Sequence, residues 1–211
     1  MAINIVTAAA AAEKVREKFP RAVIETVEFR SEQTIVLTIG QLVAVCAYLQ
    51  KNLQYTFLST ITAVDWDERV PRYDVVYHLL SIPNRSELRL KVRVGERREE
   101  HPSVPTVISV WPGANWYERE VYDMFGITFA GHPDLRRILM PNDWTTHPLR
   151  KDYPLTGFDL PEPYWGGQVP YDTDPGVGNQ TLRSPGGREL NESRSDISSN
   201  QEPGTMKNND L

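Results

Sequence analysis

The sequence predicts an α+β domain with two layers, in which helices cover one face of a mixed or antiparallel sheet. The first indication is the order of periodic segments in residues 1–110, which runs helix, two strands, helix, three strands. The second is that this order lacks the repeated strand–helix–strand units of a nucleotide-binding fold. The third is composition, because large apolar residues become scarce from about residue 166. Residues 166–211 are therefore expected to form an irregular, extended tail that is free in solution or wraps a partner.

Two segments predict helices in the first part of the chain. Residues 7–19 are rich in strong helix formers, Thr7 can cap them, and Pro20 ends them. Residues 41–53 carry apolar residues at helical spacing, which indicates an amphipathic helix with one buried face. These apolar residues are Leu42, Val45, Cys46, Leu49 and Leu53.

Five segments predict strands. Residues 21–30 and 33–39 are β-branched runs separated by two polar residues, as in a half-buried hairpin. Three later strands are predicted at residues 55–64, 72–81 and 86–94. In the last of these, apolar residues alternate with Arg89, Lys91 and Arg93. One face of the sheet should therefore be core and the other basic.

Residues 111–165 are expected to complete the same domain with a helix and a proline-rich strap. Asn115 can cap a helix over residues 116–125, and Glu118 can reach back to the cap amide, as in a capping box. Gly126 supplies the stop. Within the helix, Arg119 and Asp123 lie four residues apart and can pair. The strap is held in an extended, turning path by Pro133, Pro141, Pro148 and Pro154.

The charges of the helix and the strap are complementary. The helix has an excess of acids, whereas the strap supplies Arg136, Arg137, Arg150 and Lys151. We expect Glu118 or Glu120 to form a fixed ion pair with the strap, through either arginine of the pair at 136–137. Ionic groups mixed with aromatic side chains are typical of a protein interface. The alternative is a solvated loop, in which an exposed ion pair contributes roughly 0–1 kcal/mol.

Length and composition exclude several classes of protein. A chain of 211 residues suits one domain, or one domain with an accessory segment. Because Cys46 is the only cysteine, an intramolecular disulfide, a CxxC zinc site and an iron–sulfur cluster held by this chain alone are excluded. The net charge of −5 opposes binding to nucleic acid. No apolar run approaches the roughly 18–20 residues that cross a bilayer, and the alanine tract at residues 8–12 does not resemble a secretory signal.

Two enzymatic hypotheses are weaker than the interface. A metal site could use Glu120, Asp123, His132 and His147, but their spacings match no compact ligand set. A hydrolase could use Glu118 and Asp123 as an acid–base pair, although structural ion pairing causes such clusters more often. His78 and His101 occur singly, so we expect each to fill core or surface space.

The residues from 118 to 155 carry a family signature. The runs ERE at 118–120, DMFG at 123–126 and GHPDLRRIL at 131–139 closely resemble the 30-kDa subunit family of respiratory complex I, which includes the C subunit of bacterial NADH-quinone oxidoreductase. HPLRKDYPL at 147–155 continues the match, and weaker similarity covers about residues 15–160. The family more often has glycine where this chain has Thr146. A positive φ there would strain threonine.

The resemblance implies a structural subunit without its own cofactor, in the peripheral arm of a proton-translocating NADH:quinone oxidoreductase. Its partner would be the 49-kDa-type subunit that helps to form the quinone site, and FMN and iron–sulfur clusters would belong to other subunits. The assembly would lie on the cytoplasmic side of the bacterial inner membrane, so contact with the membrane would be indirect. The equivalent subunit of a membrane-bound hydrogenase or of a ferredoxin-dependent quinone reductase is the alternative. The residues expected to organise the partner interface are Glu118, Arg119, Glu120, Asp123, His132, Arg136, Arg137, His147, Arg150, Lys151 and Asp152.

Overall fold

The centre of the fold is a five-stranded sheet. The structure is a computed structural model that describes residues 6–96, 99 and 101–154. The strands are β1 (Val23–Phe29), β2 (Glu32–Leu37), β3 (Phe57–Asp65), β4 (Tyr73–Ser81) and β5 (Ser86–Val94), in the order β1-β2-β5-β4-β3. All five match the strands predicted from the sequence. The predicted tail at residues 166–211 lies outside the described residues.

The sheet is mixed. Neighbouring strands are antiparallel except β2 and β5, which run parallel. Parallel neighbours need a crossover connection rather than a tight turn. Here the chain leaves β2 through helix α2 (Leu42–Leu53), forms β3 and β4, and only then returns beside β2 as β5. The predicted α+β class with a mixed sheet is confirmed.

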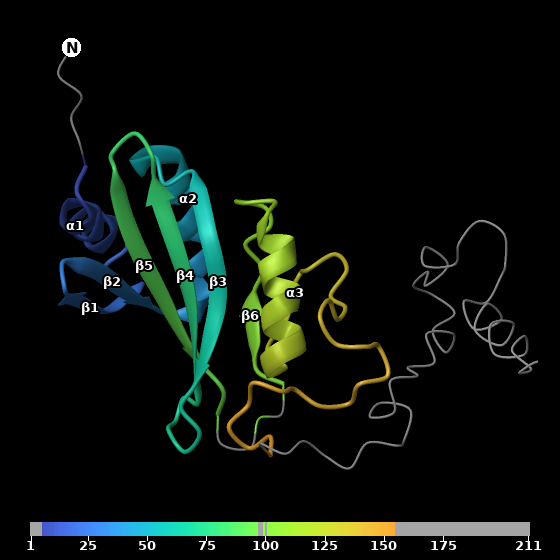
Figure 1. Cartoon of the computed structure of the whole chain (residues 1–211). Helices are drawn as coiled ribbons and strands as arrows, with labels where there is room; N and C mark the ends of the chain where they lie inside the picture. Colours follow the sequence, from blue (N-terminus) through green and yellow to red (C-terminus); the bar gives the residue numbers. More distant parts are fainter. Residues whose placement is uncertain (1–5, 97–98, 100, 155–211) are drawn as a thin grey trace, which may run out of the picture. The chain divides into compact units, whose positions relative to one another are not determined.

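The helices α1 (Ala8–Lys18), α2 and α3 (Ala114–Phe125) pack against one face of the sheet. Thr7 Oγ1 accepts a hydrogen bond from the Ala10 amide at 3.2 Å, which confirms the predicted cap of α1. One buried cluster contains Val15 of α1, Leu49 of α2 and Val121 of α3, together with apolar side chains of β4 and β5. In the view of Figure 1, α2 lies behind the sheet and α3 lies beside β3. No helix in the described part of the chain is long and apolar enough to cross a membrane.

The face of the sheet opposite the helices, here called the open face, is charged. Cross-strand pairing places Asp74 beside Arg93 and Val76 beside Lys91. Asp74 is only 2% exposed, and Arg93 forms an ion pair with Glu25 of β1 at 3.0 Å. The basic face predicted from β5 is therefore present, but acids on neighbouring strands pair with its cations.

Two short strands were not predicted. β6 (Ser103–Pro105) and β7 (Thr128–Ala130) form a separate parallel pair that joins the segments on either side of α3. A three-residue strand is too short to show a periodic pattern.

The predicted start of α3 is wrong. Gly113 precedes the first helical residue, and Asn115 lies inside the first turn, so no capping box forms. The predicted stop at Gly126 is confirmed, because this residue has a φ of +74°. Thr146 does not occur among the described residues with positive φ, so the strain considered for it does not arise.

Candidate functional site

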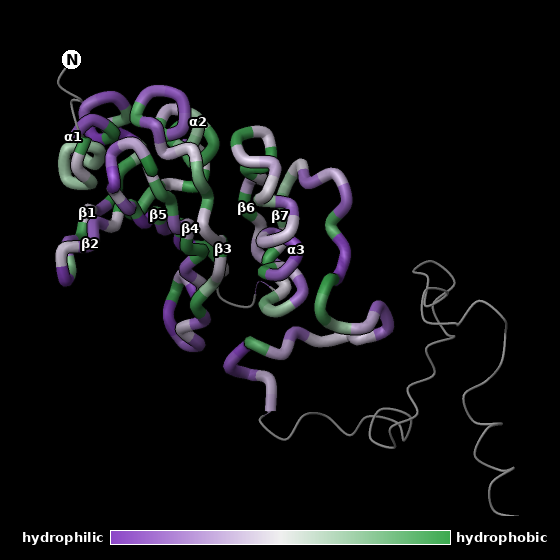
Figure 2. Tube along the Cα trace, turned by 45° about the horizontal axis from the view of Figure 1, so that its top comes forward, coloured by the Kyte–Doolittle hydropathy of each residue, from purple (hydrophilic) through white to green (hydrophobic). Residues whose placement is uncertain are grey.

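The segment with the family signature folds as α3, β7 and the described part of the strap, residues 131–154. The strap has no regular secondary structure and turns back beneath α3 (Figure 1). Hydrophilic and hydrophobic stretches alternate along it (Figure 2). Because irregular backbone cannot satisfy its own hydrogen bonds, its buried groups need partners from elsewhere.

Asp123 supplies many of these partners. It is 0% exposed, and its Oδ2 accepts hydrogen bonds from the amides of Ile138, Leu139 and Met140 at 3.0, 2.7 and 2.8 Å. Its Oδ1 forms an ion pair with Arg137 Nη1 at 2.6 Å. Burial alone would raise the pKa of Asp123, but these hydrogen bonds lower it. The ionised carboxylate therefore fixes three consecutive residues of the strap against α3.

Two arginines connect the helix and the strap through backbone carbonyls. Arg119 donates from Nε to Arg136 O and from Nη2 to Arg137 O, both at 3.1 Å. Its guanidinium lies 5.3 Å from the centre of the Trp116 ring, a cation–π distance. Arg137 also donates to Thr146 O at 3.0 Å. Both side chains thus satisfy strap carbonyls that would otherwise lack partners.

Glu118 connects α3 to the segment after β6. Its Oε1 accepts from the Val107 amide at 2.8 Å, and its Oε2 accepts from the Thr106 hydroxyl at 2.6 Å. The residue is 0% exposed, and burial raises its pKa to about 6 although both hydrogen bonds act in the opposite direction. Its proton is therefore held more tightly than that of an exposed glutamate.

His147 and Arg150 close the strap over the end of α3. His147 donates from Nδ1 to Asp123 O at 2.9 Å, and burial lowers its pKa, so the ring is neutral at pH 7. Arg150 donates from Nε to Phe125 O at 2.6 Å. A Cβ atom on Gly126 would collide with both side chains. Glycine is therefore required at this position for space as well as for its positive φ.

The end of the described strap is anchored to the β3–β4 hairpin. Asp65 accepts from Arg72 at 2.8 and 2.6 Å and from the Lys151 amide at 2.8 Å. Arg72 also pairs with Asp152 at 3.0 Å. Although burial alone would raise the pKa of Asp65, the hydrogen bonds lower it. Asp65 and Arg72 were absent from the predicted site residues, and the only signal for them was the weaker family similarity near residues 63–65.

A second set of side chains points away from this network. Glu120 on α3 is exposed, and Arg136 pairs only at the surface, with Asp134 at 2.9 Å. Large apolar side chains are also exposed here, at Trp116 (60%), Leu139 (62%) and Leu149 (53%). Exposed aromatic and aliphatic groups next to charges have the composition of a docking surface.

The predicted ion pairs between helix and strap are wrong in detail. Glu118 bonds to the segment after β6, Glu120 is exposed, and the acid that meets Arg137 is Asp123. The predicted pair within the helix is also wrong, because Arg119 donates to strap carbonyls. Sequence spacing could not choose among several carboxylates of equal charge, since the choice depends on which of them lies under the strap.

The geometry does not favour hydrolysis at this cluster. Glu118 and Asp123 are both 0% exposed, and each is engaged by several hydrogen bonds, so neither can reach a substrate. Within residues 6–96, 99 and 101–154, no group of three or more His, Cys, Asp or Glu side chains could hold a metal ion. His132 instead joins the strap to α3, since its Nδ1 accepts from the Asp134 amide at 3.0 Å and its Nε2 lies 3.4 Å from Asn115 O.

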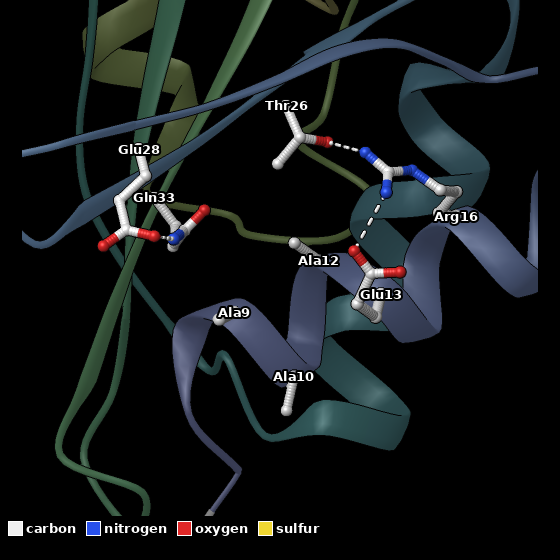
Figure 3. Close-up of a pocket in the computed structure, with 8 residues that line it drawn as sticks. All are labelled: Ala9, Ala10, Ala12, Glu13, Arg16, Thr26, Glu28 and Gln33. Atoms are coloured by element: carbon white, nitrogen blue, oxygen red, sulfur yellow. Dashed lines mark hydrogen bonds and ion pairs between the residues drawn. The ribbon is translucent and has the colours of Figure 1, made fainter.

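A hollow of about 450 Å³ lies elsewhere, between α1 and the β1–β2 hairpin (Figure 3). It is lined by Ala9, Ala10, Ala12, Glu13, Arg16, Thr26, Glu28 and Gln33. Another hollow of about 330 Å³ on the open face is lined partly by His78, whose pKa is lowered by burial and by the nearby Arg89. Neither hollow is lined by residues of the family signature.

Comparisons with known proteins agree with the signature. The family described as "Respiratory-chain NADH dehydrogenase, 30 Kd subunit" matches residues 35–159. The C subunit of NADH-quinone oxidoreductase from Geotalea uraniireducens is 50% identical over 153 residues, which cover 72% of this chain and 91% of that protein. The corresponding protein of Roseiflexus sp. is 48% identical over 145 residues, or 68% of this chain and 82% of that protein.

Solved structures extend the similarity to the fold. A trypsin-resistant fragment (1-134) of Nqo5 has a TM-score of 0.51 and 34% identity, and the match covers 59% of this chain and 99% of the fragment. A chain of the membrane-bound sulfane sulfur reductase, an archaeal respiratory membrane complex, has a TM-score of 0.54 and 25% identity, with 68% and 83% covered. As its signature predicted, this chain belongs to the 30-kDa subunit family of the respiratory-chain NADH dehydrogenase, which includes the C subunits of bacterial NADH-quinone oxidoreductases.

Proposed function

We propose that this chain is a structural subunit of the peripheral arm of a proton-translocating NADH:quinone oxidoreductase, where it docks the 49-kDa-type subunit of the quinone site. Relatives about half identical to it are named as the C subunit of that enzyme. In this proposal the complex lies on the cytoplasmic side of the bacterial inner membrane. The chain contacts the membrane only through its partners.

The observation that carries this proposal is the division of the signature residues into two sets. Those of the first set bind the strap to the rest of the chain, and they are Glu118, Arg119, Asp123, His132, Arg137, His147, Arg150, Lys151 and Asp152. Those of the second set are exposed on the same element, and we call them the docking surface: Trp116, Glu120, Arg136, Leu139 and Leu149. Buried polar bonds are an expensive way to hold a loop unless its exact shape matters, as it does for a partner.

The role of the docking surface is positional. The strap is held by directional bonds from α3 and from the β3–β4 hairpin, so its exposed side chains are ordered before the partner arrives. Binding then costs less conformational entropy. A fixed contact can keep the partner's quinone cavity in register, since small misplacements of reacting groups are costly to transfer reactions.

Electron carriers belong to other subunits in this proposal. One cysteine cannot hold an iron–sulfur cluster, which commonly needs four thiolates. FMN and the clusters are therefore assigned to partner chains.

A second candidate is the equivalent subunit of a related respiratory complex, such as a membrane-bound hydrogenase or a ferredoxin-dependent quinone reductase. The 25% identity to a chain of the archaeal sulfane sulfur reductase supports it. Purification of the native complex and identification of its subunits distinguish the two. Subunits with nucleotide and flavin sites support the NADH enzyme, and their absence supports the relative.

The docking surface is tested by the double replacement Trp116→Ala and Leu139→Ala in the full chain, expressed with its partners. Both side chains are more than half exposed, so the isolated variant should unfold at the wild-type temperature. Its recovery in the purified complex should fall at least about tenfold, because exposed aromatic anchors dominate binding energy. Ile82→Ala is the matched control, since Ile82 is 65% exposed in the β4–β5 turn. Equal recovery of both variants contradicts the proposal.

A further inference from the structure

We propose that the outer edge of β1 is a second docking site, which accepts an extended segment of another subunit as an added strand. The proposed segment alternates apolar and basic side chains. This inference rests on the proposed function, because it assumes that the chain works inside an assembly. It concerns a part of the chain outside the family signature.

The first observation is the position of β1. It is the last strand of the sheet, and in the part of the chain that the structure describes it has a strand neighbour on one side only, β2. A strand at such an edge presents unpaired backbone donors and acceptors along its free side. These groups can form a full ladder of hydrogen bonds with an incoming extended segment.

The second observation is the apolar character of this edge. Ile24, Val27 and Phe29 are exposed by 57, 40 and 64%. Soluble proteins usually protect an edge with lysine, proline or a short strand. β1 has seven residues and contains neither lysine nor proline, and its irregularity lies at one end, between Val23 and Glu25. An exposed apolar edge of this length is therefore a surface that a partner covers in the working protein.

The third observation is the hollow beside the edge. Cross-strand register places Thr26 beside Ile35 and Glu28 beside Gln33, on the helix side of the sheet. The hollow of about 450 Å³ opens between these residues and α1. In Figure 3 the alanines of α1 lie on one side of it, and Thr26, Glu28 and Gln33 lie on the other. A strand added to β1 would direct every second side chain toward this hollow.

The charges at the edge select the partner. Arg16 of α1 bonds to Glu13 at 2.9 Å and to Thr26 at 2.8 Å, so this cation is already engaged. Glu28 accepts a hydrogen bond from the neutral amide of Gln33 at 2.6 Å. A lysine or arginine can lay its aliphatic stem along the alanines and bring its charge to Glu28.

A second copy of this chain fits the edge poorly. Strand pairing of two β1 edges would bring Glu25 and Glu28 of one copy near the same acids of the other. Like charges on neighbouring strands are destabilising. The charge of the edge therefore favours a different, basic segment over self-association.

Hydrogen exchange in the native complex tests the proposal. We expect the amides of β1 to exchange at least about tenfold more slowly in the complex than in the isolated full chain, because an added strand protects the free edge. Oxidative footprinting of Trp116 is measured in the same samples. Protection of Trp116 without protection of β1 overturns this inference and leaves the proposed function standing, whereas exposure of Trp116 in the complex counts against the proposed function itself.

A matched pair of variants tests the same edge. Val27 on β1 and Val64 on β3 are exposed by 40 and 38% and lie on the open face, each on an outermost strand. Val27→Lys should lower recovery in the complex about tenfold, and Val64→Lys should not. Glu28→Gln should weaken assembly less than Val27→Lys, but measurably. Equal effects of the two lysine variants overturn the proposal, as does a dimer of the isolated chain that Val27→Lys dissociates, because the occupant would then be a second copy.

Discussion

In the sheet the fully buried side chains are mostly apolar, whereas between α3 and the strap several are ionic. Leu90 and Val92 of β5 are 0% exposed and pack among other apolar residues. Glu118 and Asp123 of α3 are equally buried, yet each is surrounded by hydrogen-bond donors. The two regions lie in one chain but are held together by different forces.

The difference shows what each region has to do. Apolar packing is non-directional and tolerates many combinations of side chains of suitable volume. A network of buried ionic groups stabilises little in net terms, but it fails when one partner is lost. The sheet therefore needs only to be stable, whereas the strap is held in one particular path.

The largest effect is expected from Asp123→Ala. This change removes the acceptor of three strap amides and leaves Arg137 buried without its carboxylate, so the free energy of unfolding should fall by about 3–5 kcal/mol. Asp123→Asn keeps the shape and should lose less. Denaturant unfolding measures the change, and hydrogen exchange should show the amides of residues 138–140 opening before those of β4 and β5. Simultaneous opening of the strap and the sheet would remove the proposed contrast between the regions.

A smaller effect, dependent on pH, is expected at Glu118. Burial raises its pKa to about 6 from a usual value of 4.5, so the folded chain binds more protons than the unfolded chain between these values. Its contribution is fully present below pH 4.5 and is lost as the pH rises through 6, by about 2 kcal/mol at most. Glu118→Gln should abolish this part of the pH dependence. Unfolding free energies at pH 4.5 and 7 measure it, and identical slopes for the two proteins would contradict the assignment.

The smallest effect is expected in the sheet, at Tyr77. Its hydroxyl is buried and has no hydrogen-bond partner in the described structure. Tyr77→Phe should therefore change the free energy of unfolding by no more than about 1 kcal/mol, and in the stabilising direction. Thermal unfolding of the isolated chain measures this. A loss larger than that of Glu118→Gln at pH 4.5 would mean that the sheet also depends on polar bonds.

The elements of the first 94 residues could be predicted because their signals are local. The alternation in β5 and the apolar spacing in α2 depend only on neighbours in sequence. β6 and β7 escaped prediction because each has three residues and forms only where α3 brings them together. The start of α3 was misplaced by the same cause, since Glu118 bonds to Thr106 and Val107 and not to a cap.

For the candidate site, the sequence identified the region and its family but not its pairings. Local periodicity and a long signature are properties of the residues in order, so the α+β class, the mixed sheet and the family followed from them. The tertiary structure alone decided that Arg137 meets Asp123, that Arg119 binds carbonyls, and that Trp116 and Leu139 remain outside. The physical reason is that several carboxylates and arginines carry equal charge, and only their positions in space determine which of them pair.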